Sequence, residues 1–146
     1  EKLLNINETL KHYFGYDSLR PGQQELIEGI LQRKDVLGIM PTGAGKSLCY
    51  QVPALMLDGI TIVVSPLISL MTDQVKALNQ TGVHAAYINS SLTENQIRTA
   101  LFYAAQGRYK IIYVAPERLN TMRFLEFACQ VDISMVTVDE AHCISQ

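Results

Sequence analysis

The segment with the clearest chemistry runs from Met40 to Ser47 and reads Met-Pro-Thr-Gly-Ala-Gly-Lys-Ser. It follows the apolar run Val36–Met40 and opens a helical pattern, so the order is strand, loop, helix. A helix N-terminus presents unpaired N–H groups and positive dipole potential, and glycines let the backbone wrap closely around phosphate oxygens. The pattern therefore predicts a loop that holds nucleotide phosphates. Its predicted phosphate-binding residues are Thr42, Gly43, Ala44, Gly45, Lys46 and Ser47.

Two side chains of this loop have specific predicted roles. Lys46 is expected to reach the β- and γ-phosphates as a compact cation, and the Ser47 hydroxyl to ligate Mg²⁺. The general pattern G-x-x-x-x-G-K-[ST], known as Walker A, has a glycine where this chain has Met40. The shorter core T-G-x-G-K-[ST] is matched, and a chance match is on the order of 10⁻⁶ per starting position. An ordinary glycine-rich turn is the alternative interpretation.

A second chemical signal, Asp139-Glu140-Ala141-His142, comes directly after the apolar run Met135–Val138. Ligands of open α/β sheets bind beyond the carboxyl ends of the strands, so Asp139 is expected to lie near Ser47 and to hold Mg²⁺ through its water shell. The adjacent Glu140 is then the candidate general base for an attacking water. An acidic pair at a strand end is common on surfaces. Its combination with the phosphate loop favours a site that hydrolyses a nucleotide.

The elements that would position these residues follow an alternating pattern. Short apolar runs alternate with amphipathic segments of helical length, which is typical of parallel strands with helices on both faces of the sheet. We therefore expect an α/β fold with a mostly parallel central sheet. The expected strands are Val36–Met40, Thr61–Ser65, His84–Ile88, Lys110–Val114 and Met135–Asp139. The expected helices are Gln23–Arg33, Lys46–Leu57, Leu67–Gln80, Thr93–Ala105 and Thr121–Gln130.

Local signals mark some of the boundaries between these elements. Pro21 is suited to the first turn of a helix, and Thr93 precedes Gln96 by the spacing of a capping box. Glycines that tolerate positive φ are expected at four junctions. These junction glycines are Gly22, Gly59, Gly82 and Gly107.

Composition limits the class of protein. The chain has 146 residues, 48% of them hydrophobic, which suits one globular domain. Its formal net charge of -2 does not indicate the basic surface that is typical of nucleic-acid-binding domains. The odd number of cysteines without a C-x-x-C pair indicates reduced thiols and no zinc site. No basic region with a following apolar run and no stretch of ~18 apolar residues is present, so we expect a soluble, intracellular protein that neither enters a membrane nor is secreted.

The motifs together resemble RecQ-type helicases of superfamily 2, over nearly the whole chain. Phe14–Tyr16 followed by Arg20–Gln23 is similar to motif 0 of that family. The resemblance implies that Tyr16 and Arg20 flank adenine and that Gln23 reads its edge. A ring and a guanidinium plane can sandwich a base, and an amide can pair with a donor and an acceptor. A turn at a helix start with one packed tyrosine is the alternative interpretation.

Two further segments resemble the DNA-side motifs of the family. Val64–Gln74 is similar to motif Ia, and Tyr113–Leu119 to the next DNA-side segment. The implied DNA-binding candidates are Ser65, Ser69 and Arg118. Hydroxyls and helix N-terminal amides can hold phosphates without a large positive patch, which reconciles a DNA role with the net charge. Capping and turn formation are the alternative for each loop taken alone.

The resemblance also covers the end of the chain. Residues 139–146 are similar to the RecQ form of the DEAH box, in which His142 would couple the nucleotide state to DNA contact. The implied fold is a single RecA-like P-loop lobe over 1–146, with motif 0 in 1–23. The implied cofactors are ATP and Mg²⁺. The implied partner is DNA, single-stranded or as a 3′-tailed duplex, in DNA repair and recombination, in the cytoplasm (nucleoid) of a bacterium or the nucleus of a eukaryote.

The family continues into a second RecA-like lobe and later domains, which lie beyond this sequence. In such motors the arginine finger comes from the second lobe, and it is worth ~10³–10⁵ in turnover. The lobe alone is therefore expected to bind nucleotide but to be nearly inactive. Two other hypotheses stay open: another superfamily 2 enzyme, such as an RNA helicase or duplex translocase, and a non-enzymatic nucleotide-sensing module.

Overall fold

The elements of the chain fall into two units, Glu1–Asp58 and Gly59–Gln146. The computed structural model describes residues 5–32 and 45–139. The expected strand Val36–Met40 lies outside these residues. The organisation of 1–146 as a single lobe stays a prediction.

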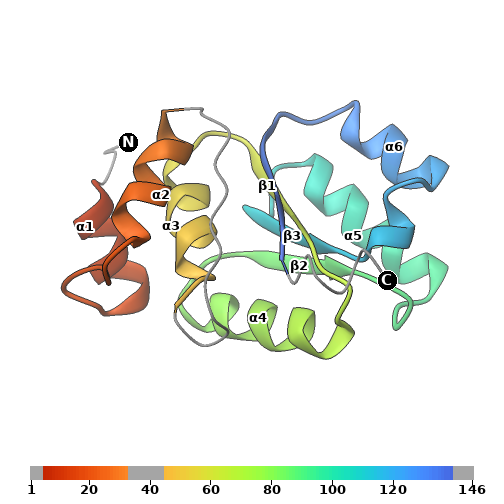
Figure 1. The fold of residues 1–146 in the computed structure, drawn as a ribbon. Helices are drawn as coiled ribbons and strands as arrows, with labels where there is room; N and C mark the ends of the chain where they lie inside the picture. Colours follow the sequence, from red (N-terminus) through yellow and green to blue (C-terminus); the bar gives the residue numbers. More distant parts are fainter. Residues whose placement is uncertain (1–4, 33–44, 140–146) are drawn as a thin grey trace. The chain divides into compact units, whose positions relative to one another are not determined.

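All regular elements among the described residues of the first unit are helical. Its elements are α1 (Ile6–Thr9), a π-helical turn η1 (Leu10–Phe14), α2 (Gln23–Leu31) and α3 (Leu48–Met56). The helices lie side by side in Figure 1, and α3 packs against both α1 and α2. A cluster of fully buried apolar side chains holds them together, namely Leu10, Ile27 and Val52.

The segment α1 was not predicted from the sequence, although the sequence carries a signal for it. The Asn5 side chain accepts a hydrogen bond from the Glu8 N–H at 2.8 Å, and the Glu8 carboxylate accepts one from the Asn5 N–H at 3.1 Å. This is a capping box, in which each residue satisfies an amide that the helix leaves unpaired. The apolar spacing of Ile6, Leu10 and Phe14 then sets the buried side of the segment.

The second unit is a parallel sheet with helices on both faces, as predicted. Within the described residues, the sheet has four strands in the order β2-β3-β1-β4, and the three neighbouring pairs are parallel. The strands are β1 (Ile60–Val64), β2 (Ala85–Ile88), β3 (Ile111–Val114) and β4 (Ile133–Val138). The helices are α4 (Ile68–Gln80), α5 (Glu94–Ala105), η2 (Pro116–Arg118, a 3₁₀ turn) and α6 (Met122–Ala128).

Alternation along the strands divides the core between the two faces. Ile62, Val64 and Ile112 belong to the cluster that packs under α5 and α6, together with Phe124. Tyr113 points to the other face, where its hydroxyl donates to the side-chain oxygen of Gln74 in α4 at 3.2 Å. Figure 1 shows α4 on one side of the sheet and α5 and α6 on the other. Every residue of the central strand β1 is buried, and all but Thr61 are apolar.

Most predicted boundaries lie within two residues of those observed, and the four junction glycines all have positive φ. The capping box is confirmed, since the Thr93 hydroxyl accepts from the Gln96 N–H at 3.1 Å and the Gln96 side chain accepts from the Thr93 N–H at 2.8 Å. The prediction for Pro21 is wrong. Gly22, with φ of 88°, is the N-cap of α2, and its left-handed backbone forces the helix to begin only at Gln23.

Candidate functional site

A buried glutamine joins the two predicted nucleotide motifs of the first unit. The Gln23 side chain is 1% exposed. Its carbonyl oxygen accepts a hydrogen bond from the Arg20 N–H at 2.6 Å, and its amide nitrogen donates to the Gly45 carbonyl at 2.9 Å. One amide therefore ties the turn of motif 0 to the phosphate loop.

The predicted phosphate loop requires glycine at position 45. Gly45 has φ of 78°, which disfavours any L side chain, and an added Cβ would lie 2.6 Å from the Gln23 amide nitrogen. The Gly45 carbonyl also accepts from the Leu48 N–H at 3.2 Å, which begins the turn into α3. The close approach of Gln23 and the start of α3 both depend on the missing side chain.

The residues after Gly45 fit a phosphate and metal site in type. Ser47 is the N-cap of α3, but its hydroxyl makes no capping hydrogen bond. Lys46 and Ser47 are both half-buried. The start of α3 thus has a hydroxyl that the helix does not use. Thr42, Gly43 and Ala44 lie outside the described residues.

The predicted adenine sandwich is exposed. Tyr16 is 55% exposed, and Arg20 is exposed as well. Next to Tyr16, the Lys11 ammonium contacts the Asp17 carboxylate at 2.8 Å, and this hydrogen bond holds the pKa of Asp17 below its usual value. Because both side chains are exposed, this ion pair between η1 and the turn contributes little stability. The Gln23 amide bonds to protein groups and keeps one further N–H and one lone pair, so its predicted role in reading adenine stays a prediction.

In the second unit, Asp139 directly follows the end of β4, as predicted. It is only 6% exposed and donates its backbone N–H to the Val64 carbonyl at 2.8 Å. Similar bonds join Ser65 to Val114 and Ala115 to Ile88, at 3.1 and 3.0 Å. The carboxyl ends of the strands therefore meet at one edge of the sheet, the edge where ligands of such folds bind. Glu140 and His142 lie outside the described residues.

The two serine candidates for DNA binding differ in exposure. Ser65 is fully buried, and its hydroxyl accepts from the Leu67 N–H at 3.5 Å, which favours the turn-forming interpretation. Ser69 is exposed in the first turn of α4. The N-cap of this helix, Leu67, provides no side-chain hydrogen bond, so the first amides of α4 are open to an acceptor from outside the helix.

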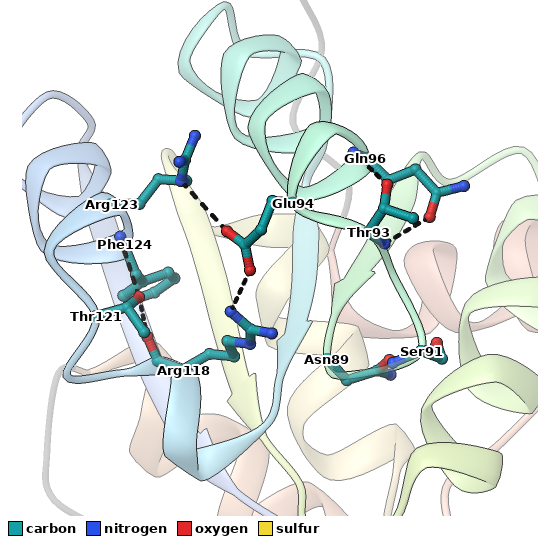
Figure 2. Close-up of polar contacts among 9 residues, drawn as sticks. All are labelled: Asn89, Ser91, Thr93, Glu94, Gln96, Arg118, Thr121, Arg123 and Phe124. Carbon is teal, nitrogen blue, oxygen red and sulfur yellow. Dashed lines mark hydrogen bonds and ion pairs between the residues drawn. The ribbon is translucent and has the colours of Figure 1, made fainter.

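Arg118, the third candidate, belongs to an ion network (Figure 2). One of its terminal nitrogens lies 3.2 Å from a Glu94 carboxylate oxygen, and Arg123 Nε lies 3.9 Å from the other oxygen. Sequence reasoning missed Glu94 and Arg123. The sequence spacing of Glu94, Arg118 and Arg123 does not predict their contact, because α5, η2 and α6 come together only in the folded protein.

Asn89 is a further residue that sequence reasoning missed. It follows β2, is fully buried, and its carbonyl oxygen accepts from the N–H and the hydroxyl of Ser91 at 2.9 and 2.5 Å. Its amide nitrogen faces the Met71 sulfur at 3.2 Å. The Asn-Ser pair after an apolar run was a signal for this turn, since an Asn side chain often bonds two residues ahead. Asn89 shapes the loop that leads to α5.

Comparison with known proteins identifies the family. A model of the DEAD/DEAH box helicases matches residues 20–146. The chain belongs to this helicase family. It is of the RecQ type, being 51% identical over 145 residues to the ATP-dependent DNA helicase RecQ of Bacillus subtilis and 47% identical over 138 residues to that of Haemophilus influenzae. These matches cover 99% and 94% of this chain but only 24% and 22% of the relatives, so the helicase chain spans about a quarter of their length.

A solved structure supports the fold of this helicase chain. The helicase MrfA, in its crystal structure bound to DNA and AMPPNP, matches with a TM-score of 0.76 over 97% of this chain and 21% of its own. The sequence identity is 16%, so the match supports the RecA-like α/β fold alone. In the described part of the chain, no helix is long and apolar enough to cross a membrane. Within the same residues, no group of three or more His, Cys, Asp or Glu side chains could hold a metal ion.

Proposed function

We propose that this chain is the ATP-binding lobe of an ATP-dependent DNA helicase, which couples ATP hydrolysis to strand unwinding. The observation that carries the proposal is the 51% identity to a RecQ over 99% of the chain, a span that includes both predicted nucleotide motifs. Use of ATP follows from membership of the DEAD/DEAH box family. The substrate and the unwinding reaction are proposals for the whole protein. Such a protein would act where DNA is held, in a nucleoid or a nucleus.

In this proposal, the described residues of the first unit bind the nucleotide. Tyr16 and Arg20 are exposed and able to stack on adenine, and Gln23 links Arg20 to the phosphate loop. The loop amides that end at Ser47 and the Lys46 ammonium hold the phosphates. Because the Gln23 side chain touches both motifs, base binding and phosphate binding would be coupled.

Mg²⁺ fits the donors that the chain offers. Hydroxyl and carboxylate oxygens are hard ligands, and Mg²⁺ in nucleotide sites usually takes one or two protein ligands with phosphates and waters. Ser47 and Asp139 are the residues that would hold it, and the ion would offset charge on the phosphate oxygens. Glu140 would accept a proton from the attacking water. That all these groups share one site stays a proposal.

DNA is the proposed partner, and the open end of α4 supports it. The exposed Ser69 and the first amides of this helix, which no side chain caps, can donate hydrogen bonds to a backbone phosphate. Ser65 would act indirectly by shaping the turn, because it is fully buried. His142 would link this surface to the nucleotide. Contacts of this kind bind the DNA backbone without a strongly basic surface. The net charge of -2 does not indicate such a surface.

The test is ATP turnover of the full-length protein with and without nucleic acid. Strong stimulation by single-stranded DNA is expected. Stimulation only by RNA or by duplex would favour another superfamily 2 enzyme, and no turnover under any condition would favour a nucleotide-sensing module. The isolated lobe should bind ATP yet hydrolyse it poorly, since an arginine finger from a second lobe would supply ~10³–10⁵ in rate.

A further inference from the structure

An open groove runs along β2, which ends the sheet on one side in the described part of the chain. The groove has a volume of about 500 Å³ and is lined by residues of α4, β2 and α5. The strand contributes Ala85, Ala86 and Tyr87 to this lining. Because two of these side chains are methyl groups, they leave space beside the main chain of β2. The main chain of this edge is therefore within reach of a ligand in the groove.

The main-chain groups of β2 point alternately to β3 and to the open side of the strand. The carbonyl oxygens of His84 and Ile88 accept hydrogen bonds at 2.8 and 3.0 Å from the N–H groups directly before and after β3. The residues of β2 with even numbers thus face β3. The N–H and carbonyl groups of Ala85 and Tyr87 therefore point to the open side.

The protein itself bonds to both ends of this edge. The Asn79 side-chain oxygen accepts from the Ala85 N–H at 2.9 Å. The Asn89 carbonyl accepts from the Leu92 N–H at 3.2 Å. Among the described residues, no such partner bonds to the N–H and carbonyl of Tyr87, which lies between these two ends. Because unpaired groups on an edge strand are a template for another strand, the open part of the edge is short and centred on Tyr87.

Positive charges flank the groove. Among the described residues, no charged side chain lines the groove itself. The exposed Lys76 directly follows the lining residue Val75 in α4. The Arg108 guanidinium lies 4.6 Å from the ring centroid of Tyr103, which also lines the groove. Asp73 is two residues from Val75 and so belongs to another side of α4. The surroundings of the groove therefore favour a ligand with negative charge.

We propose that the groove along β2 is a docking site for an extended, acidic peptide segment of a partner protein, which adds a strand to the sheet at Tyr87. In an antiparallel pair, one residue of the peptide would exchange two main-chain hydrogen bonds with Tyr87, at about 4.8 Å from β2. Its carboxylates would lie toward Lys76 and Arg108. Main-chain bonds supply affinity in this mode of binding, and side-chain contacts supply specificity. The inference goes beyond the proposed function, because it uses neither the nucleotide nor DNA.

A second copy of the chain fits the groove less well than an acidic peptide. Two copies that paired through β2 about a twofold axis would present the same residues to each other. Lys76 and Arg108 of one copy would then approach a surface with the same positive charges. Like charges in contact oppose association, whereas an acidic peptide meets the opposite charge.

The first experiment selects ligands from a displayed library of random octapeptides, with the full-length helicase as the target. Peptides that also bind Tyr87→Pro are removed. Proline at this position lacks the N–H that faces the groove, and an edge strand tolerates it because that N–H does not pair with β3. We expect the remaining peptides to be rich in β-branched residues, which suit strands, and in Asp and Glu.

Binding of one selected peptide, labelled with a fluorophore, is then measured by anisotropy. Tyr87→Val is the matched control, because it removes the ring but keeps the main-chain N–H. Tyr87→Pro should bind the peptide roughly 2- to 12-fold more weakly than Tyr87→Val, the range that one hydrogen bond contributes. Melting curves and DNA-stimulated ATP turnover of both variants should match those of the wild type.

A series of N-methylated peptides tests the same pairing without changing the protein. Each peptide has one amide blocked by a methyl group. Because alternate residues of a strand bond to its neighbour, binding to the wild type should weaken at every second position near the paired residue and stay unchanged at the positions between. This series decides the inference even if Tyr87→Pro does not fold.

The charges are tested by Lys76→Gln and Arg108→Gln. Each should weaken binding of the acidic peptide by up to about fivefold at low salt, and the difference should shrink at high salt. Arg98→Gln is the control, since Arg98 lies four residues after Glu94 and so on the side of α5 that carries Glu94, which does not line the groove. Its affinity should stay near that of the wild type.

Four results would overturn the inference. They are a library without peptides that prefer the wild type to Tyr87→Pro, a methylation series without alternation, equal peptide affinity in the wild type and both charge variants, and a wild-type dimer in sedimentation that Tyr87→Pro abolishes. None of these results bears on the proposed function. A wild-type protein whose ATP turnover DNA did not stimulate would contradict the proposed function alone.

Discussion

Replacing Gln23 by alanine should weaken nucleotide binding through the phosphate loop. The substitution removes two hydrogen bonds of a side chain that is 1% exposed, those with the Arg20 N–H at 2.6 Å and the Gly45 carbonyl at 2.9 Å. A typical intramolecular hydrogen bond contributes a net ~0.5–1.5 kcal/mol. The pair is therefore worth about 1–3 kcal/mol, which corresponds to a roughly 5- to 150-fold decrease in affinity if it acts wholly on the bound loop.

The assay is a titration of the full-length protein with fluorescent ATP and GTP analogues, accompanied by melting curves. Gln24→Ala is the matched control, because the neighbouring Gln24 is exposed and bonds to the exposed Glu28 carboxylate at 3.1 Å. Its effect should stay within about 0.5 kcal/mol. Gln23→Glu should be at least as harmful as Gln23→Ala, since a carboxylate keeps the acceptor for Arg20 but places a negative oxygen against the Gly45 carbonyl.

The comparison of the two nucleotides separates two roles of Gln23. If the amide supports the loop, Gln23→Ala weakens binding of the ATP and GTP analogues by similar factors, because both carry the same phosphates. If it only reads adenine, the weakening is confined to ATP. Unchanged binding of both nucleotides in Gln23→Ala, or an equal weakening in Gln24→Ala, would refute the reasoning.

Three other predictions concern single residues. Lys46→Ala should abolish ATP binding or turnover with an unchanged circular dichroism spectrum, and normal turnover would remove Lys46 from its role. Glu140→Gln should bind ATP but stall hydrolysis, because an amide cannot act as a base; hydrolysis at the wild-type rate would end that assignment. Burial raises the pKa of the Cys49 thiol, so its thiolate fraction at mildly alkaline pH is lowered. Alkylation followed by mass spectrometry should label the exposed Cys129 before Cys49, and faster labelling of Cys49 would contradict its burial.

The sequence predicted the central strands well because β1 and β3 are buried along their whole length. A mostly apolar run such as Ile60–Val64 has few interpretations other than a buried strand. The capping box at Thr93 predicted the start of α5 to within one residue. The start of α2 at Gln23 and the positive φ of Gly22 were predicted as well. Only the first-turn position expected for Pro21 was wrong, because Pro21 precedes the N-cap Gly22.

The site could be predicted only in part, for a physical reason. The chemistry of residues within one loop, such as Lys46 and Ser47, can be predicted from their local spacing. Contacts between segments that are distant in the sequence cannot be predicted in this way. The bond from Gln23 to Gly45 and the network from Glu94 to Arg118 depend on how helices pack, and side chains of these types are usually solvated surface residues.

The central claim is that Ser47 and Asp139 face one magnesium ion bound to the triphosphate. A crystal structure of the full-length protein with Mg²⁺ and a non-hydrolysable ATP analogue tests it most directly. We expect Ser47 Oγ at about 2.0–2.1 Å from the ion, and the Asp139 carboxylate within hydrogen-bonding distance of a metal-bound water. A metal without Ser47 among its ligands, or an Asp139 carboxylate too distant for one water to bridge, would contradict the account.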